Sequence, residues 1–164
     1  MKRILKLAPA ALLVAVGIFL FAAWARYPGR APVKLAAERC DARLWDRVYE
    51  KDRLEVIEPC TAVEGRVKSV HFDEDGDVHI GLDPAQPSVL NLMNATHTGR
   101  ELVVEIVCDH LPPRDPAHAT CAGYQPQVTP PKVGDRIRVT GAYVTDRDNG
   151  WREVHPVTRI ELLR

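Results

Sequence analysis

The segment DRIRVTGAYVT, residues 135–145, decides the fold class. It predicts a β-strand with a bend at Gly141, because a glycine inside a strand is typical of bulges and tight bends. The sequence Asp-Asn-Gly at 148–150 follows and predicts a hairpin turn. Residues 151–163 then predict the last strand, in which Pro156 indicates an edge or a bulge, since proline cannot donate a ladder hydrogen bond. The chain is therefore expected to end in a β-hairpin.

A second hairpin is expected earlier in the chain. Residues 61–72 (TAVEGRVKSVHF) predict a strand in which Gly65 marks a bulge or a bend. The acidic segment 73–77 carries an Asp-Gly turn signal. Residues 77–83 then resume as a strand, and the residues on one of its faces are apolar: Val78, Ile80 and Leu82.

The middle of the chain predicts one more strand between less regular segments. Residues 101–108 (ELVVEIVC) show the strongest strand pattern of the sequence. The residues on one face of this strand are apolar: Leu102, Val104 and Ile106. Residues 88–94 predict a short helix, and residues 109–132, with six prolines, predict a long loop.

Five strands, two hairpins and a long excursion before the fourth strand predict a mainly β fold, a small five-stranded closed or half-closed barrel. The pattern resembles the OB-fold, and VGDRIRVTG at 133–141 looks like the fourth strand of many such barrels. One amphipathic helix is expected before the barrel, over residues 35–51, because Cys40, Leu44 and Val48 recur every fourth residue.

Three segments carry a closer resemblance: GDVHIGL at 76–82, ELVVEIVC at 101–108 and NGWREVHPV at 149–157. Together they resemble an uncharacterised group of small exported bacterial proteins, over residues 60–163. The resemblance implies an OB-like fold and a location outside the cytoplasm. It implies no catalytic residues, because that group has no established activity.

Residues 1–25 predict a signal-anchor or a signal peptide. Basic residues precede the uncharged run 7–24, which as a helix would be about 27 Å long, enough to span a bilayer core. This length favours a retained transmembrane helix, whereas the small-x-small pattern at 23–25 fits a cleavage site. Residues 26–34 predict a linker and residues 35–164 the OB-like domain. We expect a single-pass protein with a periplasmic domain, or a secreted domain if the leader is cleaved.

The charge balance argues against nucleic acid as a partner. The chain has 22 Lys plus Arg and 22 Asp plus Glu, so its formal net charge is zero. A protein that binds nucleic acid through bulk charge would be clearly basic. An oligonucleotide binder therefore remains only a third alternative, and its affinity would have to fall steeply with added salt.

Four cysteines allow three pairings. Disulfides Cys40–Cys60 and Cys108–Cys121 are favoured, because each closes a short loop and the expected compartment is oxidising. An alternative is a zinc site made of two thiolates and two imidazoles, from Cys108, His110, His118 and Cys121. The spacing of this set differs from the usual paired zinc-ligand arms, so the disulfide is the preferred interpretation.

The acidic segment 73–77 invites comparison with a calcium loop. Its aspartates fit the first positions of an EF-hand, but Val78 stands where glycine is required and Pro84 where glutamate is required. A solvated hairpin turn is the better interpretation.

The chemically most suggestive residues are two histidines. His79 lies on the strand face opposite the apolar residues, and His155 shares a face with Trp151 and Glu153, since strand residues alternate. If the two strands meet at one barrel opening, His79, Glu153 and His155 converge, with Asp77 or Asp83 nearby. Such a set can hold a divalent metal or serve acid–base chemistry, and equally it can be a structural hydrogen-bond network, which is the favoured interpretation.

These observations lead to two main hypotheses about function. The first is a non-enzymatic, membrane-tethered or secreted binding module for a protein, a glycan or a small ligand, with no cofactor. Trp151, His155 and the loop 109–132 are its candidate contacts, because loops and exposed aromatics often carry binding. The alternative is a metal-dependent hydrolase, of phosphodiesters for example, that uses His79, Glu153 and His155.

Overall fold

The computed structural model describes residues 39–113 and 117–164. The signal-anchor or signal peptide expected over 1–25, the linker over 26–34 and the start of the expected amphipathic helix lie outside the described residues. Within the described residues, no helix is both long enough and apolar enough to cross a membrane.

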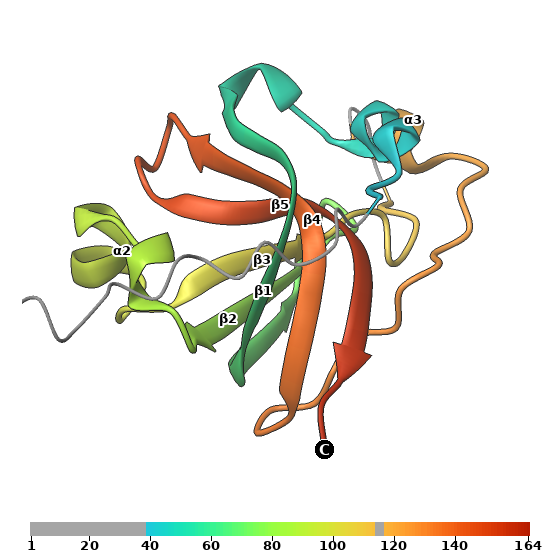
Figure 1. Ribbon diagram of the computed structural model, residues 1–164. Helices are drawn as coiled ribbons and strands as arrows, with labels where there is room; N and C mark the ends of the chain where they lie inside the picture. The colour runs from blue at the N-terminus through green and yellow to red at the C-terminus, as the bar shows by residue number, and fades with distance from the viewer. Residues whose placement is uncertain (1–38, 114–116) are drawn as a thin grey trace, which may run out of the picture. The chain divides into compact units, whose positions relative to one another are not determined.

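Five strands form one mixed sheet (Figure 1). They are β1 (Leu54–Phe72), β2 (Val78–Pro84), β3 (Leu102–Ile106), β4 (Arg136–Asp146) and β5 (Arg152–Leu162). All neighbouring strands pair antiparallel except β3 and β5, which pair parallel. Because β1 pairs with both β2 and β4, the sheet closes as a barrel in the order β1-β2-β3-β5-β4. The expected mainly β fold with five strands is confirmed.

Strand β1 begins earlier than the sequence predicts. It starts at Leu54 instead of residue 61, and its first part pairs with the end of β4, where Leu54 lies opposite Asp146. The charged residues Glu55 and Glu58 and the adjacent Pro59 interrupt the strand pattern there, and the register to β4 shifts on both sides of Glu58. The extra length extends the pairing of β1 with β4 to the end of β4.

Both glycines expected at bends lie where two strands approach closely. A Cβ atom at Gly65 would lie 2.5 Å from the carbonyl oxygen of Asp83, and one at Gly141 would lie 2.5 Å from that of Pro156. The β4–β5 register also shifts on either side of Gly141. A larger residue at either position would therefore push paired strands apart.

The helices are short. They are the 3-10 helices η1 (Ala42–Arg47), η2 (Lys51–Arg53) and η3 (Pro87–Val89), and the α-helices α2 (Leu92–His97) and α3 (Ala117–Cys121). Helix α2 partly overlaps the helix expected over 88–94, and α3 lies inside the long loop expected over 109–132.

The described part of the segment 35–51 is a shorter and tighter helix than the amphipathic one expected there. Asp41 caps η1 by accepting a hydrogen bond from the Arg43 backbone, and the chain becomes extended again at Val48. The expected apolar stripe is nevertheless buried, since Leu44 and Val48 pack against β4 residues such as Val144.

Apolar side chains gather in two clusters. The larger cluster fills the barrel with residues of all five strands, including Val67, Ile80, Val104, Val139 and Val154. The smaller cluster joins η1 to the outer side of the sheet through Leu44, Val48, Leu54, Val107, Ala142 and Val144. On β3 and β5, residues that alternate with those of the larger cluster are also buried, and they form the site described next.

Candidate functional site

A group of ionisable side chains is buried where β2, β3 and β5 meet. Glu105 of β3 is 2% exposed, and Glu153 and His155 of β5 are 0% and 1% exposed. Burying charged groups costs much free energy unless each is paired and hydrogen-bonded. Their partners therefore decide what this cluster can do.

Glu105 stands between two imidazoles. Its Oε1 lies 3.3 Å from Nε2 of His79, and its Oε2 lies 2.8 Å from Nδ1 of His155. His79 faces Glu105 directly in the β2–β3 register. The parallel β3–β5 pair places Val103 beside Glu153, so Glu105 and His155 both lie two residues further along their strands.

Further groups complete the cluster. Nδ1 of His155 also lies 3.2 Å from Oε1 of Glu153, whose other oxygen accepts a 3.0 Å hydrogen bond from Nε1 of Trp151. Arg53, at the end of η2, forms ion pairs with Asp146, Glu105 and Glu153. Three cationic groups thus alternate with carboxylates in this cluster.

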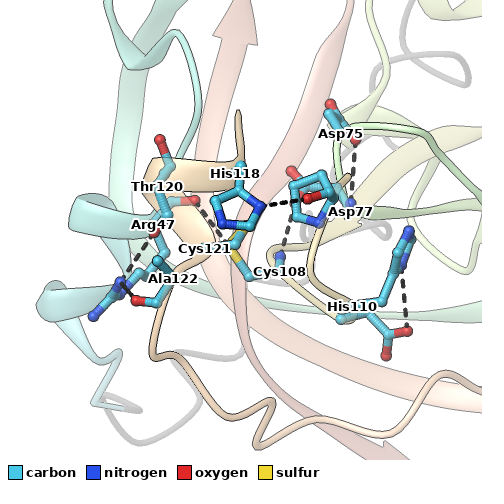
Figure 2. The surroundings of a disulfide bond; sticks show 11 residues. Arg47, Asp75, Asp77, Cys108, His110, His118, Thr120, Cys121 and Ala122 are labelled. Carbon is cyan, nitrogen blue, oxygen red and sulfur yellow. Dashed lines mark hydrogen bonds and ion pairs between the residues drawn. A yellow bond between two sulfur atoms is a disulfide. The ribbon is translucent and has the colours of Figure 1, made fainter. Parts of the chain in front are cut away.

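The acidic turn after β1 reaches the same cluster. It is the expected hairpin turn, closed by a hydrogen bond from the Asp73 amide to the Asp77 carbonyl, with Gly76 at a φ of 96°. The Asp73 carboxylate lies 3.2 Å from Nδ1 of His79, so it continues the network to the surface. The Asp77 carboxylate is buried and accepts a 2.7 Å hydrogen bond from the Cys108 amide (Figure 2).

Burial and charge set the protonation of these groups. Burial lowers the pKa of His155, but Glu105 and Glu153 outweigh it and raise that pKa to about 10. His79 is also desolvated, yet Glu105 and Asp73 raise its pKa to about 9. Burial raises the pKa of Glu105, but the two histidines hold it well below its usual range.

The pKa values of Glu153 and Asp77 are raised instead. Burial and the charge of Glu105 raise the pKa of Glu153. Burial also raises the pKa of Asp77 to about 7, against the hydrogen bond from Cys108. The carboxylates of the cluster therefore differ widely in how readily they ionise.

Two atoms of the cluster have unused hydrogen-bonding capacity. Nε2 of His155 is buried and has no hydrogen-bond partner among the described residues. Oε2 of Glu105 likewise accepts no hydrogen bond there, although it is ion-paired with His155. Native proteins rarely leave such buried atoms unpaired, so each one calls for an explanation.

The structure brings together most of the residues that the sequence singles out. His79 and His155 both contact Glu105, and Glu153 contacts His155, so the condition set from the sequence, that the two strands come together, is met through β3. Of the two aspartates considered, Asp77 joins them whereas Asp83 is exposed near the other end of β2. Trp151 is half-buried, and its ring N–H donates to Glu153. It therefore offers less free surface to a ligand than a fully exposed tryptophan would.

Sequence reasoning missed the central residue, Glu105. The available signal was its place in ELVVEIVC, where it is a charged residue within an apolar run and alternates with Val104 and Ile106. Arg53 and Asp146 were also missed, because Arg53 lies in a short helix that the sequence does not predict and Asp146 lies one residue beyond the strand expected over 135–145.

The cysteines form the two disulfides favoured from the sequence, Cys40–Cys60 and Cys108–Cys121. The alternative zinc set is therefore not assembled, since its two thiols are bonded to each other. Nδ1 of His118 instead lies 2.7 Å from the carbonyl oxygen of Pro112, and His110 lies apart beside Asp109 (Figure 2).

A separate surface feature is a hollow of about 450 Å³ between the proline-rich segment and the end of β5. It is lined by residues 127–132, Asp135 and the β5 residues Thr158, Arg159, Ile160 and Leu162. Val128 and Ile160 pack against the barrel core, whereas Leu162 is 69% exposed. This hollow combines an apolar floor with polar groups at its sides.

Comparison of the chain with known protein families and with curated proteins finds no significant match.

Proposed function

We propose that this chain is an OB-like binding module of the extracytoplasmic space, tethered by its N-terminal segment or secreted, and that it binds an extended peptide segment of a partner protein. The observation that carries the proposal is the hollow beside β5. Its volume of about 450 Å³ lies in the range typical of ligand sites, and its lining mixes apolar with polar side chains.

The sheet topology supports a peptide as the ligand. Strand β5 pairs with β4 along its length, but its pairing with β3 covers only Glu153 and Val154. Further along, β5 borders the hollow through Thr158, Arg159, Ile160 and Leu162. Extended peptides bind strand edges through main-chain hydrogen bonds, and pockets for alternate side chains give specificity. The alternative outcome of the test below is that the hollow binds a glycan or a small ligand instead of a peptide.

The first prediction concerns Leu162, which lines the hollow. Peptides selected from a displayed seven-residue library against the disulfide-bonded protein should bind Leu162→Asp at least about tenfold more weakly, because a charge replaces an apolar contact. Calorimetric titration of the selected peptide measures the change.

The matched control is Leu92→Asp, because Leu92 is a similarly exposed leucine (75%) on α2. It should leave the affinity unchanged. Equal affinity for the wild type and for Leu162→Asp would contradict binding at the hollow.

A metal-dependent hydrolase is the second candidate, because His79, Glu153 and His155 do converge. Glu153 and His155 are almost fully buried, however, so a substrate would have to reach the cluster through His79, whose side chain is 35% exposed. We expect His79→Ala to abolish any divalent-metal-dependent hydrolysis of bis(p-nitrophenyl) phosphate while the protein stays folded. Unchanged hydrolysis in this variant would eliminate the hydrolase mechanism.

A further inference from the structure

We infer that Asp77, Glu105 and His155 form a buried binding site for one divalent transition-metal ion, with zinc as the best-fitting ion. The site is independent of the hollow beside β5. It draws its three ligands from the turn before β2, from β3 and from β5.

The spacing of the three side chains fits one shared ion. One carboxylate oxygen of Asp77, one of Glu105 and one ring nitrogen of His155 all lie within 4.8 Å of one another. Zinc–nitrogen and zinc–oxygen bonds of about 2.0–2.2 Å place neighbouring ligand atoms about 3.3–3.6 Å apart in a tetrahedral site. Small side-chain adjustments therefore bring all three atoms onto one ion.

The unused atoms of the cluster belong to this same group. Among the described residues, Nε2 of His155, which is 1% exposed, has no hydrogen-bond partner, and Oε2 of Glu105 is held only by its ion pairs with His155 and Arg53. Without a metal, a protonated His155 would bury an N–H donor at Nε2 with nothing to accept it, which is unfavourable. A metal ion bound to that nitrogen removes the donor and uses the free lone pair.

The other ring nitrogen of His155 is already held as in many metal sites. Nδ1 lies 2.8 Å from Oε2 of Glu105 and 3.2 Å from Oε1 of Glu153, and Trp151 donates to the other oxygen of Glu153. A metal-bound histidine usually donates its second N–H to a carboxylate, which fixes the ring orientation and makes the imidazole a better ligand. Glu153 is therefore assigned as the residue that positions the ligand His155.

Ligand chemistry selects the ion. Two carboxylates and one imidazole suit zinc, and they leave a fourth position that water can fill. Calcium prefers six to eight oxygen ligands. The imidazole ligand and the closely packed surroundings therefore both disfavour calcium. A divalent ion also neutralises the charges of Asp77 and Glu105 together.

The alternative metal group near the same aspartate is excluded by its chemistry. Asp77 also lies near Cys108 and Cys121, but their sulfur atoms are bonded to each other and cannot act as thiolate ligands. The hydrogen bond from the Cys108 amide to Asp77 instead connects the proposed site with the disulfide-bonded loop.

The test uses the full-length, disulfide-bonded chain in detergent, stripped of metal with a chelator. Titration with zinc against a chromophoric competitor should show one tight site per chain. Asp77→Asn and His155→Gln should each weaken binding by more than about 100-fold, because the loss of a ligand exceeds the 10–100-fold effect of losing a supporting partner. Glu153→Gln should weaken binding by about 10–100-fold.

The matched controls are Asp83→Asn and His71→Gln, which change an exposed aspartate on β2 and an exposed histidine on β1. Both should bind zinc as the wild type does. No stoichiometric site in the wild type, or unchanged affinity in Asp77→Asn, would overturn the proposal.

X-ray absorption of the zinc-loaded wild type tests the site even if the buried variants do not fold. We expect one imidazole and otherwise oxygen ligands. A spectrum with sulfur ligands or with two or more imidazoles would place the metal elsewhere and overturn the proposal.

Discussion

At Glu105 a single carboxylate within an apolar strand meets His79, His155 and Arg53. Pairing with Glu105 explains how the buried His155 and the partly exposed His79 and Arg53 are tolerated close together. Breaking a buried ion pair by removing one partner is strongly destabilising, because the charges that remain are left without compensation.

We expect Glu105→Gln to lower the free energy of unfolding by about 3–5 kcal/mol, the usual effect of breaking a buried pair. Urea denaturation of the metal-free protein measures the change. Glu64→Gln, at an exposed position of β1, is the control and should change stability by less than about 0.5 kcal/mol. A loss below about 1 kcal/mol for Glu105→Gln would show that the cluster is solvated or rearranges easily.

Only some of the residues in this cluster could be predicted from the sequence. Alternation along the strands placed His79 opposite the apolar residues of β2 and placed Glu153 and His155 on one face of β5. Alternation could not reveal that Glu105 contacts the two histidines, because these contacts depend on which strands are neighbours in the sheet. The parallel β3–β5 register, at Val103 and Glu153, brings together positions about fifty residues apart in the chain.

At the scale of elements, α2 depends on Asn94, which is fully buried. Its side chain and that of Asn91 cap the helix reciprocally, and its amide donates to the carbonyls of Glu101 and Arg152. This short helix is thereby attached to β3 and β5. The helix expected over 88–94 was displaced towards the C-terminus because this paired cap fixes its start after Asn91.

We predict that Asn94→Ala destabilises the protein by about 2–4 kcal/mol, since several buried backbone groups lose their partner at a cost of about 1–3 kcal/mol each. Thermal and urea unfolding measure the effect. Thr96→Ala, at an exposed position of α2, is the control and should stay close to the wild type. Equal stability of the two variants would contradict the assigned role of Asn94.

At the scale of the whole molecule, disulfides hold segments that contribute little to the apolar core. Cys108–Cys121 closes a loop with a sequence separation of 13 residues, and Cys40–Cys60 connects the start of η1 with β1. The pairing was predictable from the sequence because the shortest loops are the easiest to close. The start of β1 and the bounds of the short helices were not predictable from the sequence, because the local composition there conflicts with the usual strand and helix patterns.

We predict that the double variant Cys108→Ala/Cys121→Ala loses about 2–4 kcal/mol of stability, as expected for a loop of this size. Arg47 should limit the loss of local structure, because it donates to the carbonyls of Thr120 and Ala122. Urea unfolding gives the change in stability, and hydrogen exchange reports on the loop. Unchanged stability would show that the loop is held by its packing alone.

We propose that the hollow beside β5 is the binding surface of the barrel. An NMR titration of the full-length protein with the library-selected peptide, followed through backbone amide shifts, tests this proposal most directly. We expect the largest shifts at residues 127–129, 132, 158–160 and 162. Shifts concentrated instead at His79 and Asp73, where the buried cluster reaches the surface, would contradict it and favour the hydrolase.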